Sequence, residues 1–368
     1  MHSVIINMEL ANSLSLGSIV PEPKRLSTLI NVGNSCYINV CIQVLGHTSP
    51  LRELFTTGLY KELFHNEPAT LHTKFVTDYN NLMKGMYGDR EDCIVQPITF
   101  RNTLITCVDQ FSGYRQQDAH ECLVFILHLL HCGLGVPVLL ETASTEPGRN
   151  PTTAWANFLK HEKNSHILTW FYGQYESVKK CMNCNTVFPT YDAWNCLSLE
   201  IPLSLMKAEY SLNDLFTAHI TAERLTDKYD CENCKAPHDA MTQHVIWKCP
   251  NILIIQMKRF RNGGKIVVPI DFPFELDLRP FVSNGNQNQS TVYDLYGVVY
   301  HQGQMNGGHY LAACKIKMQD WYAFNDEKQH PITPDRVVTP FAYVLFYRKR
   351  ISGINGEFVP PLWNTWNE

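Results

Sequence analysis

Asn31-Val-Gly-Asn-Ser-Cys36-Tyr-Ile-Asn, near the N-terminus, and Gly307-Gly-His309-Tyr, near the other end, are the two stretches that decide the fold of this chain. The second is soon followed by Trp321-Tyr-Ala-Phe-Asn325-Asp326. A cysteine that opens a helix, a histidine on a strand preceded by glycines, and a downstream amide or acid are the parts of a Cys-His-Asn or Cys-His-Asp hydrolase. Two CxxC pairs lie between the cysteine and the histidine. This order predicts a thiol peptidase with a zinc-pinned insertion.

The composition of the 368 residues is typical of a globular protein. Hydrophobic residues make up 45% and charged residues 18%, and the length allows one large domain or two ordinary ones. The formal net charge of -4 argues against nucleic acid as a direct partner, because phosphate binding usually needs a basic excess. The apolar run 122–130 is interrupted by His128 and is too short to span a bilayer, so no membrane partner is predicted.

The thirteen cysteines favour a reducing compartment. They are odd in number and scattered along the chain, whereas disulfide scaffolds are short and rich in cysteine. No N-terminal segment combines the features of a secretory signal. We therefore expect a cytoplasmic or nuclear location, with the cysteines as free thiols or metal ligands.

The pattern from residue 29 to about 163 is helical. Four apolar residues fall at positions i, i+3, i+4 and i+7 of one helix face, namely Ile38, Cys41, Ile42 and Leu45. They predict a helix that begins near Cys36. Residues 116–131 are apolar nearly all round after a polar first turn, which predicts a buried helix. Residues 142–153 are rich in Ser, Thr, Pro and Gly and are predicted to form a loop.

After Trp170 the sequence changes to short segments of β character, separated by Gly, Pro and Asn. The predicted strands are 172–178, 195–201, 244–247, 252–257, 293–300, 310–315, 321–324 and 342–347. Such short strands indicate an antiparallel sheet region, with 283–290 as a polar loop between two of them. Helices followed by strands predict an α+β fold.

Cys36 is the candidate nucleophile. Asn34 and Ser35 are good helix caps, and a thiol in the first turn feels the positive end of the helix dipole, which lowers its pKa. The alternative is that Cys36 is one more small buried hydrophobe. Asn31 can direct its side-chain amide at the oxyanion that forms when Cys36 attacks a carbonyl. A turn-forming asparagine is the alternative for Asn31.

His309 is the candidate base because Gly307 and Gly308 allow a tight turn before it, which would expose its side chain at a cleft. His301 is the competing candidate. A hairpin between the predicted strands 310–315 and 321–324 would bring Asn325 or Asp326 close to His309. Asn325 as the orienting residue leaves Asp326 as a supporting acceptor, and an ordinary Asn-Asp turn is the alternative for both.

The CxxC pairs are Cys181/Cys184 and Cys231/Cys234. Chance alone yields about 0.5 such pairs in this composition, so a single pair would mean little. Two pairs with turn-like interiors predict one closed, structural zinc site with four cysteine ligands at the tip of an extension. A redox CxxC is the runner-up, and a nucleic-acid-binding zinc ribbon is disfavoured by the acidic net charge.

These residues together resemble the ubiquitin-specific protease family of deubiquitinases, over roughly residues 29–348. The similar stretches are Asn31-Val-Gly-Asn-Ser-Cys36-Tyr-Ile-Asn-Val-Cys-Ile-Gln43, Tyr114-Arg-Gln-Gln117-Asp118-Ala-His-Glu121, Pro250-Asn-Ile-Leu-Ile-Ile-Gln-Met-Lys258-Arg259-Phe260 and Tyr296-Gly-Val-Val-Tyr-His-Gln-Gly through His309-Tyr310 to Asp326. Ser35 and Ile38 depart conservatively from the Thr and Met that are usual in the family.

The resemblance implies a papain-like cysteine peptidase with a helical thumb, a β-rich palm and zinc-pinned β fingers. It implies a leader at 1–27, a catalytic domain at 28–350 and a tail at 351–368. The implied subdivisions are the thumb at 28–165, the fingers and the start of the palm with the zinc site at 170–260, and the palm with the histidine segment at 261–350.

The resemblance also implies the roles of individual residues. Cys36, His309 and Asn325 would be catalytic, with Asn31 in the oxyanion hole and Asp326 in support. The implied contacts to the ubiquitin tail are Gln117, Asp118, Glu121, Gly308 and Tyr310. The tail is Arg-rich, so acidic groups can pair with it. A negatively charged first helical turn is the alternative for Asp118 and Glu121.

The expected function is a deubiquitinase that cleaves the (iso)peptide bond after the C-terminal glycine of ubiquitin. Ubiquitin and ubiquitinated proteins are the expected partners, and the need for an activating protein partner is left open. The alternatives are a non-catalytic ubiquitin-binding scaffold and a protease for a ubiquitin-like modifier.

Overall fold

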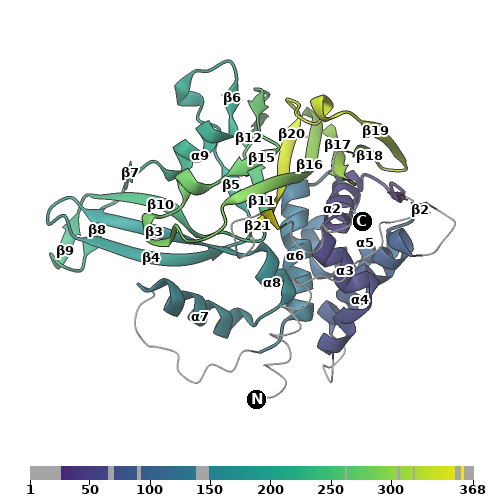
Figure 1. Cartoon of the computed structure of the whole chain (residues 1–368), viewed down its shortest axis with the longest axis horizontal. Coiled ribbons are helices and arrows are strands. Elements are labelled where there is room, and N and C mark those ends of the chain that lie inside the picture. The colour runs from purple at the N-terminus through teal and green to yellow at the C-terminus, as the bar shows by residue number, and fades with distance from the viewer. Residues whose placement is uncertain are drawn as a thin grey trace.

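Helices dominate the first part of the chain. A computed structural model describes residues 26–64, 70–88, 93–137, 149–261, 263–304, 307–317, 320–352 and 358–359. The early helices are α2 (Cys36–Gly46), α3 (Ser49–Thr56), α4 (Leu71–Tyr87), α5 (Ile98–Cys107) and α6 (Ala119–Leu134). Figure 1 shows them gathered at one end of the molecule. A short parallel pair, β1 (Thr28–Leu29) with β2 (Ile94–Val95), lies beside them. We call this group the thumb.

Helix α2 is buried along its whole length, and its predicted start at Cys36 is confirmed. The predicted side-chain cap is wrong. Ser35 does occupy the N-cap position, but its hydroxyl makes no capping hydrogen bond to the helix. The hydroxyl instead accepts a hydrogen bond from the backbone N–H of Val32 and lies 3.3 Å from Asn31 Oδ1, so Ser35 folds the loop that precedes the helix.

Helix α6 begins three residues later than predicted. Asp118 is its N-cap and accepts hydrogen bonds from the backbone N–H groups of His120 (2.6 Å) and Glu121 (3.3 Å). A capping carboxylate fixes the first helical residue just after itself. Gln116 and Gln117 therefore stay in the loop before the helix.

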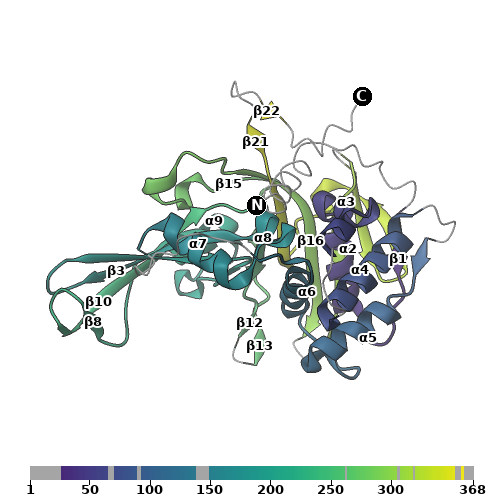
Figure 2. The same ribbon diagram turned by 90° about the horizontal axis from the view of Figure 1, so that it is seen from below.

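A long β extension forms the fingers. Its four strands run in the order β4 (Val187–Trp194), β3 (Gly173–Cys181), β10 (Ala240–Lys248) and β7 (Glu223–Arg224), all antiparallel. A separate hairpin, β8 (Tyr229–Cys231) with β9 (Ala236–His238), lies at the tip, and helix α7 (Pro151–Glu162) packs against β4. Figure 2 shows the extension projecting away from the thumb.

The palm is a larger sheet in the middle of the molecule (Figure 1). Its strand order is β19 (Lys328–Ile332), β18 (Trp321–Asn325), β17 (Gly307–Lys315), β16 (Val292–Gln304), β20 (Ala342–Lys349), β11 (Ile252–Met257) and β5 (Leu197–Leu199), with β15 (Glu275–Asp277) on β16. Neighbours are antiparallel except β11 and β5. The predicted α+β class and the predicted hairpin between β17 and β18 are confirmed.

The palm sheet is buried on both faces. Along β11, Ile252 and Ile254 join the core that contains the thumb helices, while Leu253 and Ile255 join a second core on the opposite face. Helix α9 (Leu212–Ile220) contributes to that second core. Helix α2 packs directly on β16, β17 and β18, so its first residue lies against the strands that carry the candidate base.

The remaining elements are short. They are helix α8 (His166–Phe171), the strand pairs β6 (Tyr210–Ser211) with β14 (Ile270–Asp271), β12 (Phe260–Arg261) with β13 (Gly264–Lys265) and β21 (Ile351–Ser352) with β22 (Phe358–Val359), and the 3-10 turns Leu59–Phe64, Asp109–Phe111, Leu203–Leu205, Arg279–Phe281, Asn284–Asn286 and Pro334–Arg336. Within the described ranges no helix has the length and apolar character needed to cross a bilayer.

Some sequence predictions of the elements differ from the structure. Each of the eight predicted strands overlaps an observed strand, but β4 of the fingers, β15 and β19 of the palm and the short two- and three-residue strands outside the palm were not predicted. Helix α7 starts at Pro151, inside the predicted loop 142–153, because Asn150 caps it by accepting hydrogen bonds from Thr152 and Thr153. Residues 142–148 of that loop, most of the leader and most of the tail lie outside the described residues.

Candidate active site

Cys36 is the first residue of α2, and its thiol lies against strand β17. The residue is 4% exposed. The backbone N–H of Tyr310 acts on its sulfur and favours a lower pKa of the thiol. Tyr310 directly follows His309, so the fold brings the candidate nucleophile and the candidate base to the same strand from opposite ends of the chain.

The surroundings raise the pKa of the Cys36 thiol. Burial is the largest cause; the Tyr310 N–H acts in the opposite direction, and the Asp326 carboxylate raises the pKa further. The sequence predicted a lowered pKa from the helix dipole, and this prediction is wrong in its net direction, because removing a thiolate from water outweighs the dipole. The thiol therefore needs a base to take its proton.

His309 is held by Asn325. The Nε2 atom of the imidazole lies 2.7 Å from Asn325 Oδ1, across the antiparallel β17–β18 pair. Because an amide oxygen only accepts, Nε2 carries the proton in this contact, which leaves Nδ1 of the neutral ring with a free lone pair. The geometry thus prepares Nδ1 to accept a proton.

Asp326 contacts the loop before α2 and α2 itself. It occupies a two-residue turn between the paired residues Asn325 and Lys328, with a left-handed φ of 49°. Its Oδ2 accepts a hydrogen bond from Asn31 Nδ2 (2.9 Å), and its Oδ1 accepts one from Asn39 Nδ2 (2.7 Å). The carboxylate is 3.9 Å from His309 Nε2, beyond hydrogen-bond distance.

Asn31 is placed by contacts at both ends of its side chain. Its Oδ1 accepts hydrogen bonds from the backbone N–H groups of Gly33 and Ser35, each at 3.1 Å. Its own backbone N–H donates to Glu327 Oε1 at 2.8 Å. The side-chain amide carries two N–H bonds, and the contact to Asp326 uses one of them. No described residue accepts a hydrogen bond from the other N–H.

The four cysteines of the CxxC pairs meet at the tip of the fingers. Their sulfurs lie within 4.8 Å of one another, with Cys181 Sγ 4.0 Å from Cys234 Sγ and Cys184 Sγ 3.6 Å from Cys231 Sγ. A tetrahedral Zn–S distance of about 2.3 Å implies sulfurs about 3.8 Å apart. The residues present therefore fit a four-sulfur metal site.

Both pairs have the same local backbone. Asn185 and Lys235, each directly after the second cysteine of a pair, have left-handed φ angles of 58° and 55°. Their backbone N–H groups donate hydrogen bonds to the carbonyl groups of Cys181 and Cys231, with N···O distances of 2.9 and 2.8 Å. All thirteen cysteines lie in the described residues, and none of them forms a disulfide.

Comparison with known families assigns the chain. The profile described as ubiquitin carboxyl-terminal hydrolase matches residues 27–347. The chain belongs to the ubiquitin carboxyl-terminal hydrolase family. The resemblance inferred from the sequence is confirmed.

Two curated members of the ubiquitin carboxyl-terminal hydrolase family show the extent of the likeness. The chain is 32% identical over 338 residues to ubiquitin carboxyl-terminal hydrolase 2 of Homo sapiens, covering 88% of this chain and 55% of that protein. It is 29% identical over 351 residues to ubiquitin carboxyl-terminal hydrolase 21 of Mus musculus, covering 87% and 61%. The chain thus spans about half the length of the curated relatives it matches.

Solved structures of this hydrolase family share the fold. The SAGA DUB module of Ubp8, Sgf11, Sus1 and Sgf73 bound to monoubiquitin contains a chain that is 26% identical, with a TM-score of 0.73, covering 94% of this chain and 74% of that chain. The same module bound to ubiquitin aldehyde has a TM-score of 0.72 at 26% identity, with coverages of 91% and 72%. The predicted fold class is confirmed.

The residues expected to contact the substrate lie where the thumb meets the palm. Asp118 is fully engaged, because its second oxygen accepts a hydrogen bond from Tyr343 Oη at 2.6 Å in addition to capping α6. Glu121 is exposed and accepts one from Gln110 Nε2 at 3.0 Å. Gln117 is half-buried and donates to the Gln110 carbonyl group at 2.8 Å. Of the two acids, Glu121 is therefore freer to pair with an external cation.

Gly308 and Tyr310 lie on the palm side, on strand β17. Tyr310 is buried (5% exposed), and its ring lies 4.6 Å from that of His301. His301, the competing base candidate, is 2% exposed and packs edge-on against Phe260. Burial lowers the pKa of His301 to about 4. His301 is therefore a core residue.

Sequence reasoning missed two contacts that bring the thumb and the palm together. Gln116 Oε1 accepts a hydrogen bond from the Gly308 backbone N–H at 2.7 Å, and its Nε2 donates to the Gly308 carbonyl group at 2.5 Å. Asn39 contacts Asp326 as described above. Both residues lie inside stretches that the sequence had singled out, but no local pattern identifies a partner that lies 192 or 287 residues away.

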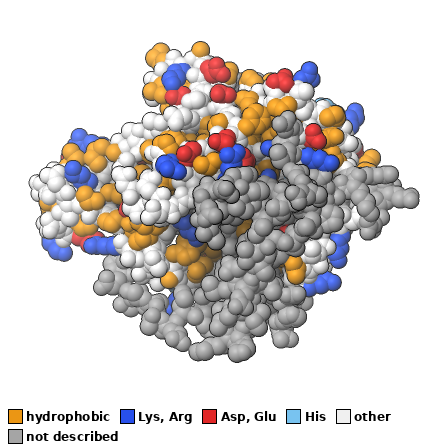
Figure 3. All heavy atoms as spheres, viewed as in Figure 1, with side chains coloured by type: hydrophobic (Ala, Val, Ile, Leu, Met, Phe, Trp, Pro, Cys, Tyr) orange, Lys and Arg blue, Asp and Glu red, His pale blue; other side chains and the backbone are white. Residues whose placement is uncertain are grey.

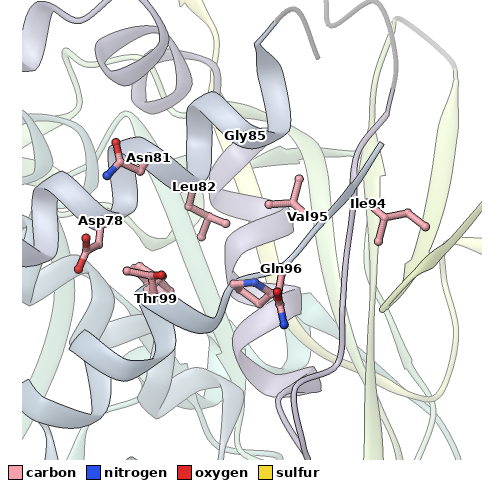
Figure 4. Close-up of a pocket in the computed structure, with 10 residues that line it drawn as sticks. Asp78, Asn81, Leu82, Gly85, Ile94, Val95, Gln96 and Thr99 are labelled. Atoms are coloured by element: carbon pink, nitrogen blue, oxygen red, sulfur yellow. The ribbon is translucent and has the colours of Figure 1, made fainter. Parts of the chain in front are cut away.

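A cavity of about 310 Å³ lies in the thumb, apart from the candidate site. Residues of α4, β2 and α5 line it, among them Asp78, Val95 and Thr99 (Figure 4). Cys36 and His309 are not among its lining residues. On the described surface in Figure 3, acidic and basic side chains are interspersed among apolar ones, unlike the basic stripe of a nucleic-acid-binding protein.

Proposed function

We propose that this chain is a deubiquitinase that hydrolyses the bond after the C-terminal glycine of ubiquitin by thiol catalysis. The observation that carries the proposal is the 2.7 Å contact between His309 and Asn325, on a strand against which helix α2 packs with Cys36 at its start. Membership of the hydrolase family and a solved relative bound to monoubiquitin support ubiquitin as the substrate.

The first half of the reaction forms an acyl-enzyme. Nδ1 of His309 takes the proton of Cys36, and the thiolate attacks the carbonyl carbon of the terminal glycine. When the tetrahedral intermediate collapses, the carbon–nitrogen bond breaks and His309 gives its proton to the departing amine. Asn325 keeps the imidazole in the required orientation throughout.

The second half releases ubiquitin. A water molecule gives a proton to His309 while its oxygen attacks the thioester carbon, the carbon–sulfur bond breaks, and the proton returns to the sulfur. The free N–H of Asn31 would stabilise the oxyanion in both halves, because its amide is held by Asp326, Gly33 and Ser35 before substrate arrives.

We also propose that the four cysteines bind one structural zinc ion. Four thiolates form a closed site without an open position for substrate, so the ion would fasten the β3–β4 and β8–β9 turns to each other. On the substrate side, the exposed carboxylate of Glu121 would pair with an arginine of the ubiquitin tail.

The test is reaction with ubiquitin that carries a C-terminal electrophile, followed by mass spectrometry of the adduct. We expect one covalent adduct on Cys36, and none in the Cys36→Ala variant, which should still bind ubiquitin. Cys249→Ala, which removes another buried thiol, is the matched control and should react like the wild type.

The other outcomes separate the alternatives. Binding of ubiquitin without an adduct would replace the proposal by a non-catalytic scaffold or by an enzyme that needs an activating partner. Neither binding nor an adduct would point to a ubiquitin-like modifier. An adduct on a cysteine other than Cys36 would overturn the assignment of the nucleophile.

A further inference from the structure

Asn39 is a buried amide three residues after Cys36 on helix α2. It is 2% exposed. Its Nδ2 donates to Asp326 Oδ1 at 2.7 Å and to the Ile30 carbonyl group at 3.3 Å, while its Oδ1 has no hydrogen-bond partner among the described residues. A buried amide with an unsatisfied oxygen destabilises a core, so an apolar residue would suit a purely packing role better.

The partner of Asn39 belongs to the turn that follows Asn325. Asp326 is nearly buried, with 9% of its side chain exposed, against 39% for His309. Each of its two oxygens accepts one amide hydrogen bond, Oδ1 from Asn39 and Oδ2 from Asn31. A buried carboxylate is costly unless donors satisfy it, and a hydrogen bond to a charged group is about twice as strong as a neutral one.

This one carboxylate therefore joins three segments of the candidate site. The loop before α2 also contacts the turn through the Leu29 N–H, which donates to the Asp326 carbonyl group at 3.1 Å, and through the Asn31 N–H on Glu327. Strand β18 ends at Asn325, which directly precedes the turn and holds His309. Asn39 is the contact that comes from the helix itself.

We propose that Asn39 is a positioning residue, which holds Asp326 and through it keeps Asn31 and Asn325 in register with Cys36. This inference rests on the proposed function for its effect on activity, although the contacts themselves do not depend on it. Without Asn39, the Asp326 carboxylate loses its donor from the helix, and the His309 imidazole, whose Nε2 lies 3.9 Å from Asp326 Oδ2, is a competing donor. The Asp326 carboxylate would then attract the His309 imidazole and weaken its hydrogen bond to Asn325.

The experiment compares Asn39→Ala and Asn39→Asp with the wild type. We expect both to lower kcat on a ubiquitin C-terminal amide substrate by about 10- to 100-fold, the scale of a misplaced catalytic group, with KM changed much less. Asn80→Ala is the matched control: Asn80 is also 2% exposed in a thumb helix, but among the described residues its amide forms a hydrogen bond only with Asn81, at 3.5 Å. It should leave kcat unchanged in the folded protein.

The two variants should differ in their pH dependence. In Asn39→Asp a second carboxyl group faces Asp326, so one of the pair takes up a proton more readily, and the protonated form restores a hydrogen-bond donor. The ratio of its kcat to that of the wild type should therefore rise as the pH falls. The same ratio for Asn39→Ala should be flat, because alanine cannot donate at any pH. A flat ratio for both variants would overturn the proposal.

Hydrogen exchange supplies a readout that needs no ubiquitin. The amides of Leu29 and Asn31 donate to the turn residues, so they should exchange faster in Asn39→Ala, while the amides of β20 should not change. Unchanged exchange, or a wild-type kcat in a folded Asn39→Ala protein, would refute the positioning role. A wild type that does not react with ubiquitin, with faster exchange in the variant, would refute only the proposed function.

Discussion

At the scale of single residues, burial makes Cys36, the candidate nucleophile, depend on a base to remove its proton. The pKa of Cys36 is raised, so little thiolate exists at neutral pH without help. In the proposed mechanism His309 must therefore be oriented before it can take the proton, and Asn325 is the side chain in contact with it.

We predict that Asn325→Ala lowers kcat by about 10²- to 10⁴-fold, the usual contribution of an oriented base. The KM should change little, because Asn325 contacts the imidazole and not a substrate-binding surface. Steady-state hydrolysis of a ubiquitin C-terminal amide measures both constants. Lys328→Ala, in the same turn, should behave as the wild type, and a kcat above one tenth of normal in Asn325→Ala would contradict the assignment.

At the scale of elements, the placement of strand β17 depends on how the loop before α6 meets it. The Gln116 side chain forms hydrogen bonds with the backbone N–H and the carbonyl group of Gly308, the residue just before His309. A single side chain thereby ties the thumb to the strand that carries the base.

We predict that Gln116→Ala lowers kcat/KM by about tenfold, since two hydrogen bonds of about 1 kcal/mol each are lost where the strand is placed. The melting temperature should change little because the residue is exposed. Gln287→Ala is the control, because the Gln287 side chain also donates hydrogen bonds to backbone carbonyl groups, those of Val282 and Ser283, but in a palm loop. A higher kcat/KM in Gln116→Ala would mean that the bridge closes the cleft to substrate.

The fingers are a second element whose order depends on a few side chains. The β8–β9 hairpin is short, and Cys181 and Cys231 form a small core of their own with Phe188. A core of this size cannot hold the tip together without a further link.

We predict about one zinc per chain by elemental analysis, and its loss in Cys231→Ser or on chelation. Amides of β8, β9 and the distal end of β3 should then exchange faster, while those of β16 and β20 stay protected. Cys249→Ser, at a buried cysteine outside the tetrad, should keep its zinc. Metal-free wild-type protein with ordered finger tips would show that the four thiols do not hold an ion.

At the scale of the whole molecule, two cores share the palm sheet and enclose several titratable groups. Burial lowers the pKa of His47, His166 and His301 to about 4 each. Burial raises the pKa of Glu53 to about 7. The histidines bind fewer protons in the folded than in the unfolded chain, and Glu53 binds more.

We predict that the free energy of unfolding falls as the pH drops from about 6.5 towards 4. A depressed histidine pKa stabilises the fold above the unfolded value, and that stability is lost through this window at up to about 1.4 kcal/mol per pH unit for each group. Glu53 acts in the opposite direction, but three histidines outweigh one carboxyl group. Urea unfolding at pH 7, 6 and 5 measures the slope.

The contribution of one histidine can be isolated. His166→Phe keeps an aromatic ring against Trp170, 5.3 Å away, but cannot take up a proton. Its stability should depend less steeply on pH than that of the wild type. Equal slopes in the two proteins would show that His166 does not take up its proton on unfolding.

The sequence by itself determined the local features of this protein. The helix from Cys36, six strands of the palm, the two cysteine turns and the family could be predicted, because helix periodicity, β-branched runs and CxxC spacing depend on neighbouring residues. The start of α6 and the strand β4 were predicted less well, because a capping aspartate and an exposed edge strand carry weak patterns.

Only the tertiary structure decided which groups meet. It made Asn325, and not Asp326, the hydrogen-bond partner of His309, and it buried His301 in the core. It also raised the pKa of Cys36, where the sequence had predicted a lower value. It also brought Gln116 to Gly308 and Asn39 to Asp326. These outcomes depend on burial and on contacts between residues far apart in the chain, which hydrogen-bond geometry specifies and local sequence does not.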